Sequence, residues 1–131
     1  MAEQESERWL AQAKWDLKAA RDSAAAGNYE WSCFQAQQAA EKALKSYLYR
    51  EGAEPIALHS VRKLVAECEK ISPEFAGLRP AAELDLYYVP ARFPTALPDD
   101  VPHEYFTAEA AEECLSLASS VIEFVGRSSG S

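Results

Sequence analysis

Apolar residues recur along the chain at three- and four-residue steps, the spacing that places side chains on one face of an α-helix. The first such segment runs from Ser6 to about Ala26, and its apolar face holds Leu10, Ala13, Leu17, Ala20 and Ala24. Trp15 lies off this face, about 140° from Leu10 at 100° per residue. The sequence therefore predicts a helix that needs a second apolar surface for its indole ring. Gly27 and Asn28 end this helix.

A second helical segment runs from about Tyr29 to Glu51 and ends at Gly52. One face is predicted to be buried and consists of Cys33, Gln37, Ala40, Leu44, Tyr47 and Leu48. A second stripe, also at helical spacing, consists of Gln35, Gln38, Lys42, Lys45 and Tyr49. Because a tight turn joins the two long segments, we expect an antiparallel helical hairpin.

The middle of the chain is more broken. Residues 51–58 are expected to form a loop, with Pro55 as the breaker. A shorter helix is predicted over Val61–Ile71, with Ser60 as its N-cap. After Ser72 and Pro73 we expect one broken or two short helical pieces, with Pro80 at a helix start. Their apolar positions are Phe75, Leu78, Ala82, Leu84 and Leu86.

Prolines at 90, 94, 98 and 102 forbid a continuous helix from Pro90 to about Phe106. A loop of this length in a small domain is typically functional or mobile. Thr107 is the expected N-cap of a last helix over Ala108 to about Val125, and residues 126–131 are expected to be a flexible tail. No strand pattern occurs in the sequence. The predicted fold is all-α, a four- to five-helix up-and-down bundle over residues 6–125 with a proline-rich loop before the last helix.

Composition narrows the class of protein. A chain of 131 residues has room for one domain. The composition, 48% hydrophobic and 26% charged residues, is that of a globular protein and excludes disorder as the main state. No apolar run reaches the ~20 residues of a membrane span. The acidic, polar N-terminus is unlike a signal peptide. We therefore expect a soluble cytoplasmic protein that does not act at a membrane.

The net charge of −8 argues against indiscriminate binding to nucleic acid. The charge is uneven: residues 1–70 carry ten basic and eleven acidic side chains, and residues 71–131 carry three and ten. An anion is better tolerated on the first half of the chain, and a basic partner on the second.

Three cysteines, Cys33, Cys68 and Cys114, lie far apart and fall in apolar helical patterns. We interpret them as buried free thiols in a reducing compartment. No cysteine or histidine spacing indicates a metal site, and no phosphate-loop, dinucleotide or metalloprotease motif is present. No cofactor or metal is expected.

Several stretches, in order along the chain, resemble the HEPN domain family. They are Ala13–Leu17 (AKWDL), Gly27–Trp31 (GNYEW), Phe34–Lys45 (FQAQQAAEKALK), Leu58–Leu64 (LHSVRKL) and Leu84–Pro94 (LDLYYVPARFP). Together they span about residues 9–125. The resemblance implies a helical bundle that dimerises, often with a cleft between subunits. Many family members accompany minimal nucleotidyltransferases in bacterial operons, in a toxin–antitoxin-like context.

Some members of this family are metal-independent RNases with an arginine followed four to six residues later by a histidine. In this chain Arg92 matches the arginine, but ten residues separate it from His103. A compact pair that could reach one scissile phosphate is therefore absent. This departure favours a non-catalytic member of the family.

Arg92 is the first candidate for ligand binding, because a guanidinium can bind phosphate with two parallel hydrogen bonds. The alternative is a structural role, such as pairing with Asp85 or stacking on Tyr88. Tyr87 and Tyr88 could stack on a base; alternatively, one is buried and the other exposed.

Five further side chains are considered. Gln38, Lys42 and Lys45 could bind a phosphate or an acidic partner, or could form a solvated face on which Glu41 pairs with Lys45. His59 could donate to an anion at the start of the third helix, or could cap or pack locally. His103 is expected to be an exposed loop histidine.

Three functions follow. The leading hypothesis is a non-catalytic, homodimeric module that binds a nucleotide or another phosphate-containing ligand, pairs with a nucleotidyltransferase-family protein, or does both. The alternative is an endoribonuclease in which Arg92 binds the scissile phosphate of an RNA, His59 or His103 carries the proton, and Tyr88 stacks a base. The third is a scaffolding bundle without a ligand.

Overall fold

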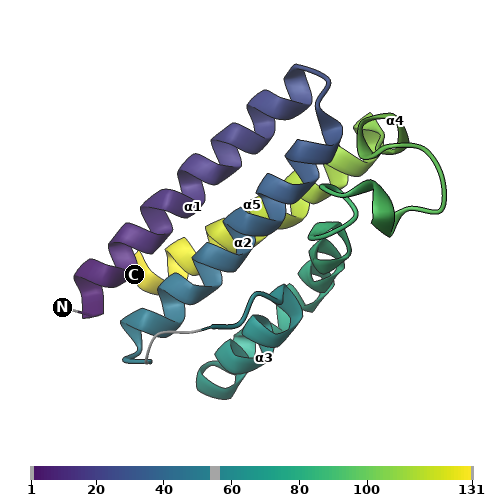
Figure 1. Cartoon of the computed structure of the whole chain (residues 1–131). Coiled ribbons are helices and arrows are strands. Elements are labelled where there is room, and N and C mark those ends of the chain that lie inside the picture. The colour runs from purple at the N-terminus through teal and green to yellow at the C-terminus, as the bar shows by residue number, and fades with distance from the viewer. Residues whose placement is uncertain (1, 54–56, 131) are drawn as a thin grey trace.

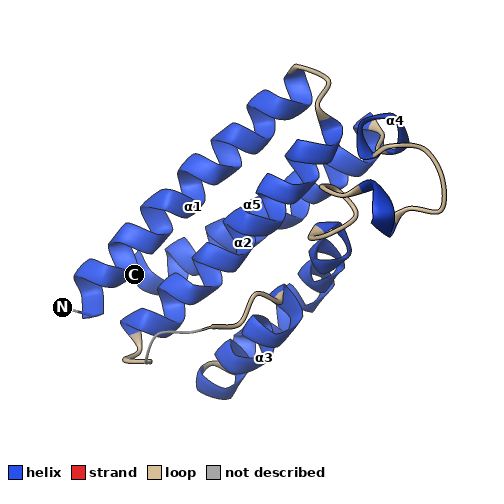
Figure 2. Cartoon of the chain, in the orientation of Figure 1, coloured by secondary structure: helices blue, strands red, loops and turns tan. Residues whose placement is uncertain are grey.

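The computed structural model of the chain describes residues 2–53 and 57–130, and all regular structure within these ranges is helical (Figure 2). The predicted all-α fold is confirmed. Pro55, expected as the breaker of the loop after the second helix, lies outside the described residues. The elements in chain order are α1 (Ala2–Ala25), α2 (Tyr29–Arg50), α3 (Val61–Ile71), the 3₁₀ segment η1 (Pro73–Tyr87), the 3₁₀ turn η2 (Pro94–Ala96), α4 (Pro102–Tyr105) and α5 (Ala108–Gly130).

Helix α2 is the centre of the bundle. It packs against α1 and α5 along its length, and also contacts α3, η1 and α4. Figure 1 shows α1, α2 and α5 side by side, with α3 and η1 along one flank of α2 and the proline-rich loop projecting at one end. The predicted buried face of α2 is confirmed, with Cys33, Gln37 and Leu44 fully buried. Its many alanines allow α1 and α5 to approach closely.

The predicted turns and caps are also confirmed. Gly27 and Gly52 adopt φ of +84° and +91°, in the left-handed region where glycine has no Cβ penalty. At the end of α1, Asn28 N donates to Ser23 O and Gly27 N to Ala24 O, the paired bonds of a Schellman motif. Ser60 Oγ accepts from Lys63 N at the start of α3. Thr107 Oγ1 accepts from Ala110 N at the start of α5.

Two helix ends differ from the prediction. Helix α1 begins at Ala2 rather than near Ser6, because the polar residues before Ser6 are also helical; the buried hydroxyl of Ser6 contacts that of Ser46 at 3.0 Å. Helix α5 continues to Gly130, through residues expected to form the tail. Arg50 Nη1 donates to Ser128 O at 3.1 Å, which connects this last turn to the end of α2.

The segment after α3 is a run of 3₁₀ turns and not broken α-helix, and Pro80 lies inside it rather than at a helix start. The 3₁₀ helix has three residues per turn, so every third residue shares a face. Phe75, Leu78, Ala81 and Leu84 follow this period and are all buried. Ala82 and Leu86, expected on the apolar face, are half-buried and exposed respectively. The buried face of η1 thus packs against α3 and α2, and η1 ends at Tyr87, with Tyr88 as its C-cap.

Candidate functional site

The guanidinium of Arg92 lies in an aromatic cage, which we define as the rings of Phe34, Tyr88 and Phe93. The guanidinium carbon is 4.6, 4.8 and 5.0 Å from these three ring centroids. Nε donates to Tyr88 O at 2.8 Å. No carboxylate pairs with Arg92 among the described residues, although the chain has 21 acidic side chains. The terminal nitrogens of the guanidinium are therefore oriented by the cage without a protein counter-ion.

Asp85 does not pair with Arg92; it caps α3 instead. Its carboxylate accepts from Val61 N at 2.7 Å, from Arg62 N at 3.0 Å and from Ser60 Oγ at 2.9 Å. These are the amides that an anion at this helix terminus would use. The chain's own carboxylate thus occupies the place where His59 was expected to help bind an anion. Stacking of Arg92 on Tyr88, the other structural role considered, is present.

Tyr87 and Tyr88 belong to separate clusters. The expectation that one is buried and the other exposed is wrong, because both are half-buried. Tyr87 packs on Phe106 with ring centroids 5.6 Å apart, and burial raises the pKa of its hydroxyl to about 12. Tyr88 packs on Phe34 and on His59. Only Tyr88 therefore belongs to the surroundings of Arg92.

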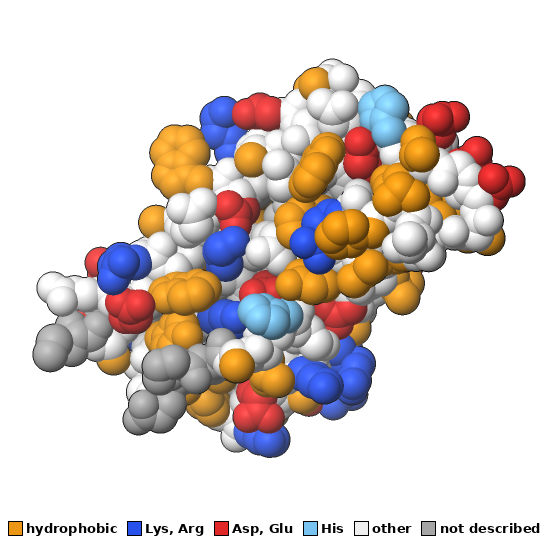
Figure 3. Space-filling model, in the orientation of Figure 1, with side chains coloured by type: hydrophobic (Ala, Val, Ile, Leu, Met, Phe, Trp, Pro, Cys, Tyr) orange, Lys and Arg blue, Asp and Glu red, His pale blue; other side chains and the backbone are white. Residues whose placement is uncertain are grey.

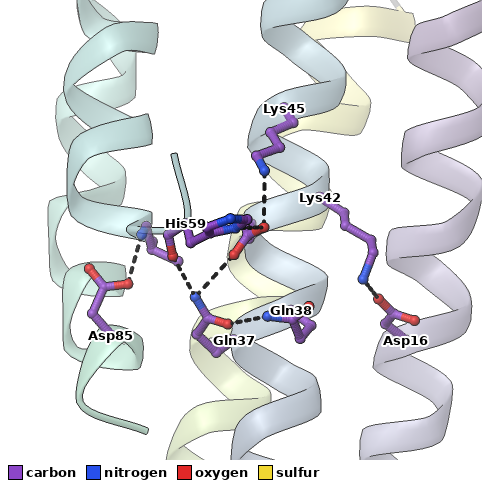
Figure 4. Close-up of polar contacts among 9 residues, drawn as sticks. Asp16, Gln37, Gln38, Lys42, Lys45, His59 and Asp85 are labelled. Atoms are coloured by element: carbon purple, nitrogen blue, oxygen red, sulfur yellow. Dashed lines mark hydrogen bonds and ion pairs between the residues drawn. The ribbon is translucent and has the colours of Figure 1, made fainter. Parts of the chain in front are cut away.

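His59 shares Tyr88 with Arg92. Its ring is stacked on Tyr88, with centroids 6.2 Å apart and planes 13° apart. Its Nδ1 is 3.3 Å from Glu41 Oε2, and its backbone oxygen accepts from Gln37 Nε2 at 3.1 Å (Figure 4). The contacts with Glu41 and Tyr88 thus orient the imidazole, although the side chain is 60% exposed.

Lys45 is the buried counter-ion of Glu41. Its Nζ lies 3.1 Å from Glu41 Oε2, and only 4% of its side chain and 6% of that of Glu41 are exposed. The ring of Trp9 lies 5.7 Å from the ammonium group. Lys45 is therefore neither on a solvated face nor free for a phosphate. The pairing of Glu41 with Lys45 that the sequence indicated is present, but in the interior.

The rest of the polar stripe on α2 is also paired within the chain. Lys42 Nζ lies 2.6 Å from Asp16 Oδ2 on α1, and Gln38 Nε2 donates to Gln37 Oε1 at 2.8 Å (Figure 4). Lys42 thus connects α2 to α1, whereas the contact of Gln38 stays within α2, and both side chains are separate from the cage.

His103 lies on α4, paired with α2, and not on an irregular loop as expected. Its Nδ1 is 3.0 Å from Glu30 Oε2. Glu30 and Glu41, which hold the two histidines, are eleven residues apart on α2, or about 16 Å at 1.5 Å per residue. His59 and His103 therefore lie too far apart along α2 to act on one phosphate together. Phe34, which contacts Arg92, lies between them on the same helix.

A surface cavity of about 380 Å³ adjoins the cage beside His59. Leu58, His59, Lys63, Asp85 and Tyr88 are among the residues that line it. The volume is within the range of small-molecule sites. Tyr88 both lines this cavity and contacts Arg92, so we describe the cavity and the guanidinium together as one candidate site.

Six exposed apolar side chains lie on α2, on η1 and on the segment from Val89 to Tyr105 that carries Arg92. They are Trp31, Leu86, Val89, Phe93, Val101 and Tyr105, which we call the apolar rim. Figure 3 shows a patch of hydrophobic side chains on this face, with both histidines at its borders. Trp15 is 64% exposed on α1, away from its apolar face, as the sequence indicated. Such surfaces are typical of protein interfaces.

The sequence did not single out Phe34, Phe93 and Glu41 as site residues. Phe34 and Glu41 precede the residues they contact by 58 and 18 positions, so no local spacing connects them. Phe93 follows Arg92 directly, and an aromatic next to a candidate arginine was the available signal.

The three cysteines are free and buried, as predicted. Burial raises the pKa of the Cys68 thiol to about 12, and a hydrogen bond with Cys33 together with burial raises the pKa of Cys114 strongly. Cys68 and Cys114 are therefore held as protonated thiols, the poorly nucleophilic form. Within the described ranges, no three or more His, Cys, Asp or Glu side chains cluster as metal ligands would, and none of the helices is long and apolar enough to cross a bilayer.

Comparison with known proteins agrees with this architecture. Residues 6–128 match the HEPN domain. The chain is similar to TT1696 from Thermus thermophilus, a crystal structure with 40% sequence identity and a TM-score of 0.85, over 93% of this chain and 96% of that one. It is also similar to ST0689, an archaeal HEPN homologue, with 34% identity and a TM-score of 0.78, over 95% of this chain and 97% of that one. No curated protein matches. With a family match over nearly the whole chain and two solved structures of the same fold, the chain belongs to the HEPN domain family.

Proposed function

We propose that this chain is a non-catalytic HEPN module that binds a nucleotide, or another phosphate-containing ligand, at Arg92. The observation that supports this best is the aromatic cage: it holds a guanidinium with no carboxylate partner in the described part of an acidic chain. A caged guanidinium with its Nε already bonded loses little freedom when its terminal nitrogens bind phosphate. Exposed Phe93 and half-buried Tyr88 supply rings for a base.

The test is a calorimetric titration with ADP as the probe. Arg92→Ala is expected to weaken binding at least tenfold, since a hydrogen bond to a charged group contributes about 1.5–3 kcal/mol. Arg79→Ala is the matched control: it removes the same charge from η1, where Arg79 pairs with Glu69, and is expected to bind ADP like the wild type. A wild-type protein that does not bind ADP, or an Arg92→Ala variant that binds it equally well, contradicts the proposal.

The same proposal includes a homodimer formed through the apolar rim, so that Arg92 lies beside the contact between the two copies. Light scattering over a concentration series measures this state. Val89→Asp is expected to give monomers, whereas Ile71→Asp, on an equally exposed residue at the end of α3, is expected to leave dimers intact. A strictly monomeric wild type at high micromolar concentration contradicts this part.

Family membership supports a nucleotidyltransferase-family protein as a further partner, and three buried free thiols fit a reducing, cytoplasmic location. Co-expression of this chain with an adjacent nucleotidyltransferase, followed by purification through a tag on one of them, tests the partner. Recovery of this chain alone contradicts it.

One observation favours the RNA-cleaving alternative. His59 has its Nδ1 on a buried carboxylate and shares Tyr88 with Arg92, an arrangement suited to a general base. Incubation with structured RNA separates the two functions. Equal background cleavage by the wild type and Arg92→Ala excludes the nuclease, whereas cleavage that is lost in Arg92→Ala replaces the non-catalytic proposal.

A further inference from the structure

The hydrogen bond to Glu41 determines which nitrogen of His59 carries the proton. Glu41 is ion-paired with Lys45, and an ionised carboxylate can only accept hydrogen bonds. The Nδ1 atom, 3.3 Å from Glu41 Oε2, must therefore be the protonated one. In a neutral imidazole with Nδ1 protonated, Nε2 is an acceptor.

The Nε2 atom has no partner among the described residues. The His59 side chain is exposed and lines the cavity together with Leu58, Lys63, Asp85 and Tyr88. Stacking on Tyr88 fixes the plane of the ring, and Glu41 fixes its rotation. With a neutral imidazole, the site therefore presents an oriented acceptor that shares the ring of Tyr88 with the oriented guanidinium.

We propose that His59 Nε2 accepts a hydrogen bond from a ribose hydroxyl of the nucleotide whose phosphate binds Arg92, so that the site selects ribonucleotides over deoxyribonucleotides. This inference rests on the proposed function. Phosphate oxygens and ring carbonyls only accept hydrogen bonds, so they cannot satisfy this acceptor, whereas a hydroxyl can.

The position of His59 favours the sugar as the source of that hydroxyl. Arg92 and His59 contact the same ring, with the guanidinium carbon 4.8 Å and the imidazole centroid 6.2 Å from the centroid of Tyr88. In a nucleotide, the group bonded directly to the phosphate is the ribose. Lys63, which has no ion-pair partner in the described part of the chain, lines the same cavity and adds a cation for a second phosphate. A nucleoside diphosphate therefore fits the arrangement.

The experiment compares ADP with 2′,3′-dideoxy-ADP by calorimetry. The wild type is expected to bind ADP about five- to tenfold more tightly, the worth of one hydrogen bond. His59→Ala is expected to bind both nucleotides equally, with an affinity close to that of wild type for the dideoxy form. His59→Gln, whose amide oxygen reaches near the position of Nε2, is expected to restore part of the preference. Circular dichroism of each variant verifies the fold.

His103→Ala is the matched control. His103 is equally exposed and is also held through Nδ1 by a buried glutamate, but it lies on α4 outside the cavity. It is expected to keep the full preference for ADP. A control that loses the preference together with His59→Ala overturns the assignment of the acceptor to His59.

The remaining outcomes separate this inference from the proposed function. Equal binding of ADP and dideoxy-ADP by the wild type overturns the ribose assignment and leaves nucleotide binding intact. If inosine diphosphate binds more weakly than ADP while dideoxy-ADP binds as tightly as ADP, Nε2 accepts from the adenine amino group. That result also overturns the ribose assignment. Binding of neither nucleotide overturns both.

Discussion

The buried ion pair between Glu41 and Lys45 leads to the sharpest stability prediction. Lys45→Met keeps a side chain of similar length against Trp9 but removes the charge that neutralises Glu41. Loss of one partner of a buried pair typically costs about 3–5 kcal/mol, because the other charge remains in the interior. Since Gln37 and the exposed His59 still donate to Glu41, we expect the lower end, about 3 kcal/mol.

Urea unfolding followed by tryptophan fluorescence measures this loss. Lys18→Met is the matched control, because Lys18 pairs with Asp22 at the same four-residue spacing and a shorter distance, 2.8 Å against 3.1 Å. Those side chains are 60% and 66% exposed, so we expect a loss of less than about 0.5 kcal/mol. The comparison isolates burial as the cause.

The double variant Glu41→Gln/Lys45→Met tests the reasoning itself. It removes both charges together, so no unpaired charge stays buried, and we expect its stability to lie within about 1 kcal/mol of the wild type. Two results contradict this explanation. One is a free energy of unfolding of Lys45→Met that is less than about 1 kcal/mol below that of the wild type. The other is a double variant that is less stable than Lys45→Met.

Three further predictions concern the bundle, each checked by urea unfolding. A hydrogen bond with Glu113 and the negative charge of Glu113 raise the pKa of Glu83 above the ordinary 4.5, so ionised Glu83 destabilises the fold. Glu83→Gln should therefore raise the free energy of unfolding at pH 7. This gain should vanish as the pH falls below about 4, because Glu83 is then protonated in the folded and the unfolded chain. Phe75→Ala, at a fully buried ring between α2 and α5, should cost about 3–5 kcal/mol, and a loss below about 1 kcal/mol contradicts the packing described. Gly27→Ala, at φ +84°, should destabilise by about 1 kcal/mol, whereas Gly126→Ala inside α5 should stabilise by about 0.5–1 kcal/mol; equal signs contradict the turn geometry.

Local signals in the sequence were sufficient for most of the architecture. The helix faces, the glycines at Gly27 and Gly52 and the caps at Ser60 and Thr107 act through residues within one or two turns. The helices they predict are present. The exception, η1, follows an equally local signal, a three-residue apolar period, which is easily mistaken for broken α-helix.

The candidate site divides in the same way. Arg92, Tyr88 and His59 could be chosen from the sequence because arginine, tyrosine and histidine carry recognisable chemistry next to a loop or a helix start. Their partners Phe34 and Glu41 could not, because they lie on α2, far along the chain from the residues they contact.

By itself the sequence determined an all-helical bundle, its turns and the residue types from which a phosphate site could be built, since these depend on periodicity and on neighbouring backbone groups. Only the tertiary structure decided which charges are available. It buried Lys45 on Glu41, paired Lys42 with Asp16 and used Asp85 to cap α3, while Arg92 kept only aromatic neighbours and a carbonyl. The reason is physical: whether a charge is neutralised depends on distances between elements that only packing brings together.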